Sequence, residues 1–180
     1  MLYKLAAICC QTLLVSAQQG NQLVNYEEMD ALASEWGFKW EHHEVYTEEG
    51  WRLALHRIRA VKGVPVESDK PPLFIMHGAY DTDFIFLERF FRDPGLPGLL
   101  AEQGYDVWMG NGRGTPYSNY NTKDGTWSEE ERWDFDWADM GRYDIPVFVD
   151  KIIEVAGKPK VTLMGYSEGN AQLFYALATN

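Results

Sequence analysis

The sequence predicts an α/β fold built on a mainly parallel sheet, and three observations predict it. Short apolar runs such as residues 73–76 alternate with segments of helical pattern along the second half of the chain. Residues 160–164 lead directly into the turn GYSEG at 165–169, and a helix-forming segment follows at once. The composition, 46% hydrophobic and 24% charged over 180 residues, is that of a chain that can bury one core.

The first 17 residues have the pattern of a cleaved signal peptide. Lys4 gives a positive start, an apolar stretch covers residues 5–17, and the small residues VSA at 15–17 suit a cleavage site. A membrane anchor is the alternative, but the stretch is shorter than the ~20 apolar residues that span a bilayer. Both cysteines, Cys9 and Cys10, lie in this segment. We therefore expect a mature, exported chain without a transmembrane anchor, a disulfide or a thiolate metal site.

The net charge of the chain argues against some classes of binding partner. The formal net charge is −11, and removal of the signal peptide takes away one lysine and no acid. Such an acidic chain repels nucleic acid and anionic lipid, so neither is expected as an electrostatic partner. The aromatic content of 14% favours a large core or an apolar binding surface. The sequence makes no prediction of oligomeric state.

Residues 18–70 are predicted to form an N-terminal segment with a β-hairpin. Residues 25–40 have the pattern of a short helix or loop. The strand-like runs 43–47 and 51–59 flank the turn EEG, which is a hairpin signal. Residues 61–72 are polar and rich in glycine and proline, so we expect them to connect the hairpin to the core.

Residues 71–180 are predicted to form the α/β core. Residues 73–76 are a fully apolar run bounded by prolines, which suits a parallel strand buried on both faces. Residues 96–103 have a helical pattern that ends at Gly104, and residues 107–109 form the next strand. Strand and helix then alternate to the end of the chain.

One aromatic helix is predicted after these strands. Ser128 and Glu131 have the spacing of a capping box, and the helical pattern continues through Trp133, Trp137 and Met140. The acidic residues between the aromatic ones could suggest a metal site. Their spacing favours instead a helix with one solvated and one buried face, so no metal is expected.

A second helix is predicted to begin near Pro146, because proline is tolerated in a first turn but not inside a helix. Gly157 ends this helix. The helix is expected to bury Phe148, Ile152 and Val155.

Ser167 is the candidate nucleophile, because it lies at the apex of a turn between a buried strand and a helix. Gly165 and Gly169 lack a Cβ atom, so they let the strand and helix approach closely. The alternative is a structural glycine turn that happens to contain serine. A nucleophilic serine needs an oxyanion hole, and the backbone N–H groups of Ala79 and Glu168 are its predicted donors.

The histidines have simpler interpretations. His77 could be a catalytic base, but we favour a role in which it shapes, with Gly78, the loop that carries the Ala79 amide. The remaining three are predicted to be surface or strand residues: His42, His43 and His56.

The glycine-rich run GNGRG at 110–114 resembles a phosphate-binding loop. Its spacing departs from G-x-G-x-x-G, because Thr115 takes the place of the last glycine. A tight turn with Arg113 in a structural ion pair is the favoured interpretation. No cofactor is therefore expected.

Six blocks of sequence, in order, resemble the acid lipase family of α/β-hydrolases, which includes gastric and lysosomal acid lipases. The blocks are VYTEEGW at 45–51, MHGA at 76–79, GYDVWMGNGRG at 104–114, WDFDW at 133–137, YDIP at 143–146 and GYSEG at 165–169. The resemblance spans roughly residues 25–180. It implies the N-terminal half of an α/β-hydrolase fold up to the turn that carries the nucleophile.

The resemblance also implies a function. It suggests hydrolysis of neutral lipid esters, triacylglycerols or cholesteryl esters, at a lipid–water interface by a secreted or lysosomal enzyme. Ser167 would be the nucleophile, with oxyanion amides at Ala79 and Glu168.

Three positions depart from the family pattern. Tyr166 stands where the family usually has histidine, Glu168 where it has glutamine, and Ala79 where it has a larger apolar residue. A carboxylate beside a developing oxyanion is unfavourable unless it points away or is protonated. Because the side chain of Ala79 is smaller than the usual residue, the shape of the acyl pocket is expected to differ from that of the family.

The serine lies close to the end of the sequence. In α/β-hydrolases the triad runs Ser, then Asp or Glu, then His, and residues 168–180 hold neither Asp nor His. We therefore expect a truncated lipase chain that lacks the cap region and the rest of the triad. The alternatives are a catalytically inactive lipid- or partner-binding protein and a non-lipase esterase. Because residues 161–164 would form an open sheet edge, residues 18–180 alone are expected to be poorly soluble.

Overall fold

A computed structural model describes residues 31, 33–60, 70–87 and 95–179. The expected signal peptide and most of the expected connection at 61–72 lie outside these residues. Within the described ranges, no helix has the length and apolar character needed to cross a membrane.

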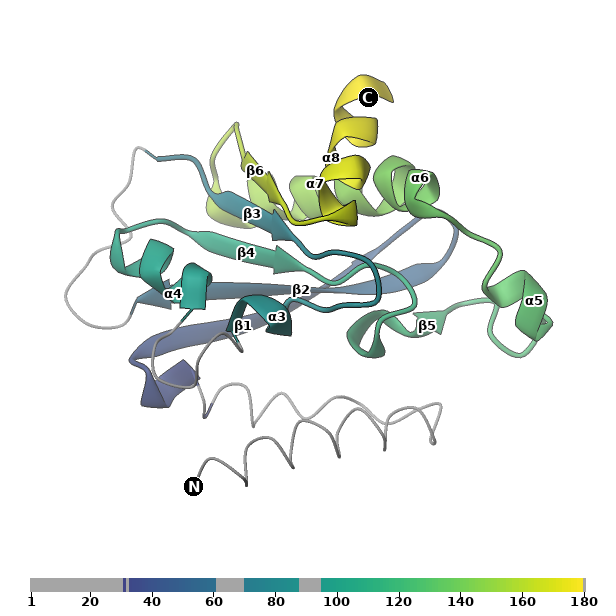
Figure 1. The fold of residues 1–180 in the computed structure, drawn as a ribbon, viewed down its shortest axis with the longest axis horizontal. Coiled ribbons are helices and arrows are strands. Elements are labelled where there is room, and N and C mark those ends of the chain that lie inside the picture. The colour runs from purple at the N-terminus through teal and green to yellow at the C-terminus, as the bar shows by residue number, and fades with distance from the viewer. Residues whose placement is uncertain (1–30, 32, 61–69, 88–94, 180) are drawn as a thin grey trace.

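A mixed six-stranded sheet forms the centre of the described chain (Figure 1). Five of its strands follow the order β1-β2-β4-β3-β6, and β5 pairs with β2. The strands are β1 (Phe38–Tyr46), β2 (Trp51–Ala60), β3 (Leu73–Met76), β4 (Val107–Gly110), β5 (Tyr120–Asn121) and β6 (Thr162–Gly165). The predicted parallel pairing is found in β4, β3 and β6, whereas the hairpin β1–β2 is antiparallel and joins β4 in antiparallel fashion.

The register of β3 explains both its sequence and the position of the site. Leu73 and Ile75 enter one hydrophobic core, and Phe74 and Met76 enter the other. A strand buried on both faces needs apolar residues at every position, which accounts for the run LFIM. Met76 aligns with the last residue of β4 on one side and of β6 on the other. The loops that follow these three strands therefore meet at one edge of the sheet.

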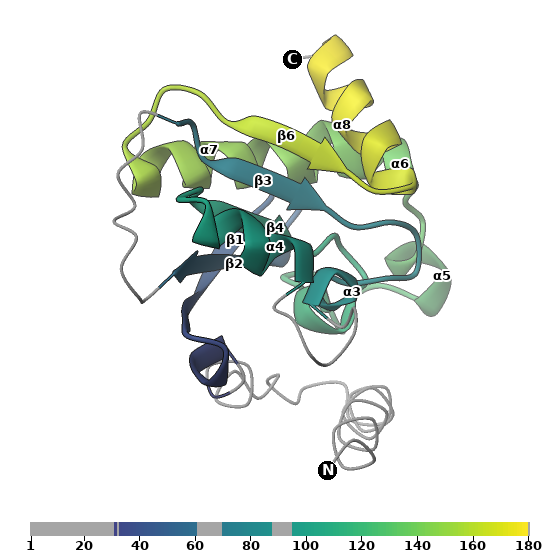
Figure 2. The ribbon, with the colours of Figure 1, turned by 60° about the vertical axis from the view of Figure 1, so that its left-hand side comes forward.

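Helices cover both faces of the sheet (Figures 1 and 2). α3 (Phe84–Leu87) and α4 (Gly95–Glu102) lie on the face that includes Leu73 and Ile75, where Leu87 and Ala101 are buried. α7 (Ile145–Ala156) and α8 (Glu168–Thr179) supply the second core with the residues Ile145, Phe148, Ile152, Leu173 and Ala176. The predicted layers of an α/β fold are thus confirmed.

The first strand begins earlier than the sequence predicted. β1 starts at Phe38, inside the segment expected to be helix or loop, and pairs with β2 along its whole length. Phe38 and Trp40 are buried in the core beside Ile58. Their tertiary contacts override the weak local pattern that suggested a helix or loop.

The predicted aromatic helix is wrong, because the chain breaks it into pieces. The capping box of Ser128 and Glu131 is present, but α5 (Glu129–Arg132) ends after one turn. Asp136 then caps α6 (Trp137–Asp139) with a capping box of its own. A π-helical segment, η2 (Met140–Asp144), leads into α7, and η1 (Pro116–Ser118) precedes β5. Asp136 takes an extended backbone conformation as the N-cap of α6, which interrupts the helical run, so two short helices form instead of one.

The exposure of several apolar residues also differs from expectation. Trp133 and Trp137 are each 45% exposed, so this region lacks the predicted buried aromatic face. Val155 is 37% exposed and not buried, although Phe148 and Ile152 of the same helix are buried as predicted. Gly157 ends α7 in the left-handed conformation, with φ of 64°, as its position indicated.

Candidate active site

Ser167 occupies the sharp turn between β6 and α8. β6 ends at Gly165, α8 begins at Glu168, and Ser167 has φ of 51°. A non-glycine residue in this left-handed region stores strain of about 1–3 kcal/mol, which persists only where the surroundings impose it. The predicted strand, turn and helix are confirmed, and the serine side chain is exposed at the apex.

The two glycines of the turn are needed for close packing, as predicted. A Cβ atom at Gly169 would lie 2.5 Å from the carbonyl oxygens of both Met76 and His77. A Cβ atom at Gly165 would lie 2.6 Å from the backbone nitrogen of Asn170. Because these obstacles are backbone atoms, any larger residue would push the serine turn away from β3.

The loop after β3 passes directly over Ser167. A Cβ atom at Gly78 would lie 2.9 Å from Ser167 Cβ and 3.4 Å from Ser167 Oγ. Ala79 follows in this loop, and its N–H has no acceptor among the described residues. The N–H of Glu168, the first residue of α8, likewise has none within the described ranges. Glu168 thus follows the serine directly and Ala79 follows the glycine that packs against it, so the residues of both predicted oxyanion donors lie close to Ser167.

The side chain of Glu168 turns along α8. Its Oε1 accepts a hydrogen bond from Nε2 of Gln172, one turn later, at 3.0 Å. Gln172 is buried, so its amide holds the carboxylate in place. The hydrogen bond to Gln172 therefore directs the carboxylate along α8.

His77 shapes the loop, as favoured from the sequence. Its Nε2 accepts the N–H of Gly112 at 3.1 Å, and its Nδ1 lies 2.7 Å from the carbonyl oxygen of Gly78. Since a carbonyl can only accept, the proton resides on Nδ1. Both ring nitrogens are engaged, so His77 has no lone pair to offer Ser167.

The other histidines lie on β1 and β2, which β4 and β3 separate from β6. All three are strand residues, as the sequence indicated. His56 is fully buried, however, so a surface location is wrong for it.

The sequence has clear relatives. Residues 29–88 match the family described as a partial α/β-hydrolase lipase region. Lipase member K from Mus musculus is 32% identical over 186 residues, which cover 100% of this chain and 46% of that protein. The chain is similar to members of the α/β-hydrolase lipase family. The resemblance read from the six sequence blocks is confirmed.

Two further comparisons bear on the chain. Gastric triacylglycerol lipase from Mus musculus is 34% identical over 146 residues, covering 81% of the chain and 36% of that lipase. An esterase from Pyrococcus furiosus has a similar structure, with a TM-score of 0.56 at 18% identity, over 82% of this chain and 49% of that one. This likeness confirms the α/β-hydrolase fold. The chain spans less than half the length of each of these relatives.

Arg113 forms the predicted structural ion pair in a tight turn. Its guanidinium donates to Asp144 at 2.7 Å and to Glu49 at 2.6 Å, and only 2% of the residue is exposed. Burial alone would lower the pKa of Arg113, but the carboxylates of Asp144 and Glu49 together outweigh burial and raise that pKa. Burial raises the pKa of Asp144, and Arg113 opposes that rise. The turn at residues 110–114 therefore connects the hairpin and the start of α7 through Arg113.

A second buried polar cluster was not predicted from the sequence. His56 Nδ1 lies 2.5 Å from Asp83 Oδ2, and Asn111 contacts both residues. All three are fully buried. The sequence carries little signal for it, because His56 lies in a strand that also contains three arginines. Pairing with a distant loop cannot be read from one strand.

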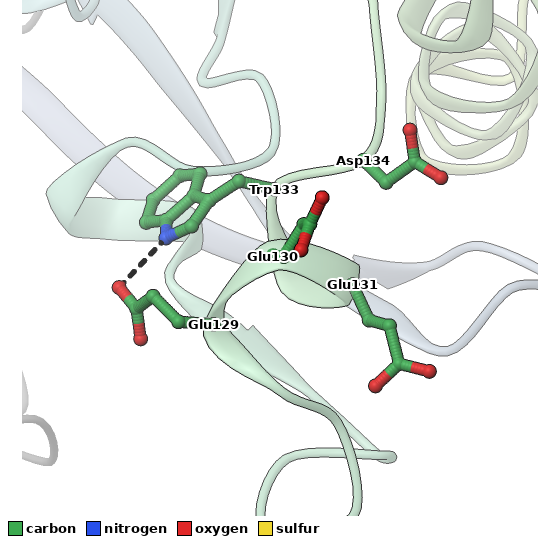
Figure 3. Close-up of a pocket in the computed structure, with 5 residues that line it drawn as sticks. All are labelled: Glu129, Glu130, Glu131, Trp133 and Asp134. Atoms are coloured by element: carbon green, nitrogen blue, oxygen red, sulfur yellow. Dashed lines mark hydrogen bonds between the residues drawn. The ribbon is translucent and has the colours of Figure 1, made fainter.

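An acidic hollow lies at α5 (Figure 3), and no residue of the serine turn is among those that line it. It has a volume of about 820 Å³ and opens to solvent. Its lining residues are Glu129, Glu130, Glu131, Trp133 and Asp134. Trp133 Nε1 donates to Glu129 at 3.1 Å. In the part of the chain that the structure describes, no three His, Cys, Asp or Glu residues are arranged to hold a metal ion.

Proposed function

We propose that this lipase-family chain is part of a serine hydrolase of the acid lipase type, with Ser167 as its nucleophile. Its substrates would be carboxylic esters of neutral lipids, either triacylglycerols or cholesteryl esters. One observation carries the proposal: Ser167 has a strained φ of 51° at a strand-to-helix turn directly beneath the loop of Gly78 and Ala79. The likeness to a gastric triacylglycerol lipase supports the substrate class.

The proposed chemistry is acyl transfer in two steps. Ser167 Oγ attacks the ester carbonyl carbon while a general base takes its proton. The N–H groups of Ala79 and Glu168 stabilise the oxyanion, since neither has another acceptor among the described residues. The base returns the proton to the leaving alcohol, and an acyl-serine remains. Water then attacks the acyl-serine by the same route, which releases the fatty acid and restores the serine.

The base of this mechanism is proposed to lie in a part of the protein outside these 180 residues. His77 uses both nitrogens in the loop, and the remaining histidines lie on β1 and β2. A chain that spans less than half of its relatives leaves room for a later Asp and His. The sequence of the transcript beyond Asn180 tests this directly.

Export of the protein is part of the proposal. The pattern of residues 1–17 supports a cleaved signal peptide and a secreted or lysosomal location. We expect the N-terminus of the protein recovered from medium or lysosomes to begin at Gln18. A mature protein that retains Met1 would contradict this.

A fluorophosphonate probe tests the nucleophile. We expect the full-length protein to be labelled at Ser167, as located by peptide mass spectrometry, and Ser167→Ala to abolish labelling and hydrolysis. Absence of labelling in a folded full-length protein would refute the assignment. Hydrolysis of an emulsified long-chain triacylglycerol or cholesteryl ester, compared with a soluble short-chain ester, separates a lipase from a non-lipase esterase.

A second candidate is a catalytically inactive protein that binds lipid or a partner lipase. The observation that favours it is the engagement of both nitrogens of His77, the histidine nearest the serine in the fold. Retention of neutral lipid vesicles without probe labelling would support this candidate.

A further inference from the structure

The loop that carries Ala79 is anchored at its first end by His77. The imidazole donates to Gly78 O at 2.7 Å and accepts from the N–H of Gly112 at 3.1 Å. These contacts connect the end of β3 to the turn after β4. His77 is 4% exposed, so both bonds are shielded from water.

The second end of the loop is anchored by Asp83. Its backbone N–H donates to Asn111 Oδ1 at 3.1 Å, and its carboxylate lies 2.5 Å from His56 Nδ1. The N–H of Asn111 donates to Ala54 O on β2 at 3.0 Å. The loop is thereby fixed to β2 and to the same turn after β4 that holds His77.

The middle of the loop has little to hold it. Ala79 and Tyr80 are exposed, and Tyr80 has φ of 57°, a left-handed conformation that costs free energy in a tyrosine. Thr82 is turned by a local hydrogen bond from its N–H to the Asp81 side chain at 2.9 Å. The position of the Ala79 amide therefore depends on the two buried ends.

We propose that the His56–Asp83 pair, held by Asn111, positions the loop of residues 78–82 so that the Ala79 N–H stays over Ser167. The proposal rests on the proposed function, because it assigns the pair a role in orienting an oxyanion donor. His56 and Asp83 act through the loop and do not touch the substrate, so they are positioning residues.

The arrangement makes the pair sensitive to small changes. Asp83 Oδ1 is buried and has no hydrogen-bond partner among the described residues, so the contact with His56 is the main support of this carboxylate. Removing one partner of a buried pair leaves the other uncompensated. Relaxation of the loop by about 1 Å is enough to lower a rate by about 10²-fold when a donor is misplaced.

The experiment compares Asp83→Ala and Asp83→Asn in the full-length protein. The matched control is Asp106→Asn, because Asp106 is also buried and accepts from the Arg57 guanidinium at 2.6 Å, one residue from His56 on β2. Three quantities are measured for each variant: the rate of Ser167 phosphonylation by a p-nitrophenyl alkylphosphonate, kcat and KM for p-nitrophenyl butyrate, and hydrogen exchange of the amides of residues 78–84.

We expect Asp83→Ala to lower both the phosphonylation rate and kcat by about 10²-fold, with KM changed less than about threefold. Asp83→Asn keeps an oxygen that accepts from His56 Nδ1, so most of the rate should be recovered. Exchange of the amides of residues 78–84 should rise in Asp83→Ala. Asp106→Asn should lower the melting temperature and leave the loop exchange and the rates near those of the wild type.

Other outcomes overturn the proposal. If hydrogen exchange of the loop amides is unchanged in Asp83→Ala, the pair does not anchor the loop, whatever the activity of the variant. Equal rate losses in the Asp83 and Asp106 variants would indicate a general effect of stability. If Asp83→Ala does not fold, Asn111→Ala takes its place, because it removes the oxygen that accepts from the Asp83 N–H. Loop exchange and rates in Asn111→Ala equal to those of Asp106→Asn would then overturn the proposal. Failure of the wild type to react with the phosphonate would instead refute the proposed function, and the exchange measurement would still decide the anchor.

Discussion

The turn after β4 holds two neighbouring parts of the molecule by different means. On one side, Asn111 and Gly112 make neutral hydrogen bonds to the loop that passes over Ser167. On the other side, Arg113 makes charged contacts to Asp144 at the start of α7 and to Glu49 in the hairpin. Both sides are buried, and they are adjacent in sequence.

The difference separates a site from its scaffold. Neutral hydrogen bonds orient the loop over Ser167 through backbone groups, and single substitutions there should alter geometry more than stability. The ion pairs of Arg113 hold separate segments together inside the core, and breaking them leaves a buried charge. Substitutions on the two sides should therefore dissociate activity from stability.

The largest effect is expected from Arg113→Met. The substitution leaves the Asp144 carboxylate buried without its partner, so the free energy of unfolding should fall by about 3–5 kcal/mol. Burial already raises the pKa of Asp144, and loss of Arg113 raises it further. The folded variant then holds a proton that the unfolded chain has lost, so its stability decreases as pH rises through this window. Urea unfolding at a series of pH values measures this.

The double variant Arg113→Met/Asp144→Asn is the control for Arg113→Met. Removing the carboxylate should restore part of the stability and abolish the added pH dependence. A single Arg113→Met variant as stable as the wild type at neutral pH would show that the ion pair does not hold the segments together.

The next largest effect is expected from Gly169→Ala, which changes the turn that carries Ser167. The new Cβ atom would lie 2.5 Å from the backbone oxygens of Met76 and His77, so the serine turn must shift. We expect a loss of about 3 kcal/mol in stability together with a strong loss of probe labelling at Ser167. The control is Gly157→Ala, which has φ of 64° but no atom within 4 Å of the new Cβ. It should lose about 1–2 kcal/mol and keep its labelling, and equal labelling in both variants would contradict the expectation.

The same contrast explains what could be read from the sequence. The serine turn was predictable because its strand, glycines and helix are contiguous, and the Arg113 turn because a failed glycine spacing excluded the phosphate loop. The pairing of His56 with Asp83 joins β2 to a loop 27 positions away, which local patterns do not encode. The split of the aromatic helix was missed because Asp136 can occupy either a helix interior or a cap, and only packing decides between them.

Asp136→Ala should cause a smaller and local loss of stability, at the start of α6. Asp136 accepts from the N–H groups of Ala138 and Asp139, and these bonds begin α6. Loss of such a cap costs about 1 kcal/mol. Thermal unfolding should show that loss with probe labelling unchanged. Ser128→Ala removes the cap of α5 in the same manner and is its matched control.

The smallest effect is expected from Glu41→Gln, in an ionic cluster on β1 far from both sides of the turn. Burial alone would raise the pKa of Glu41, but contacts with Lys39, Arg57 and Arg59 lower it from its ordinary value of 4.5 to about 2. The carboxylate therefore adds stability that is present above pH 4.5 and is lost as pH falls toward about 2. Because the cluster is partly solvated, the change at neutral pH should be only about 1 kcal/mol or less.

Acid titration of stability tests this last expectation against Glu154→Gln. Glu154 pairs with Lys151 on α7, but its side chain is 69% exposed, so its substitution should alter stability very little. Above pH 4.5 the wild type should be more stable than Glu41→Gln, and this advantage should disappear as the pH falls from 4.5 to about 2. The stability curves of the two proteins should converge below that range. Probe labelling at neutral pH should be the same in both variants, because neither residue contacts the loop over Ser167 or the turn after β4. A loss of labelling in Glu41→Gln would mean that the charge on β1 affects the site through Arg57 and its neighbour His56. Residues of β2 would then influence both activity and stability, contrary to the comparison above.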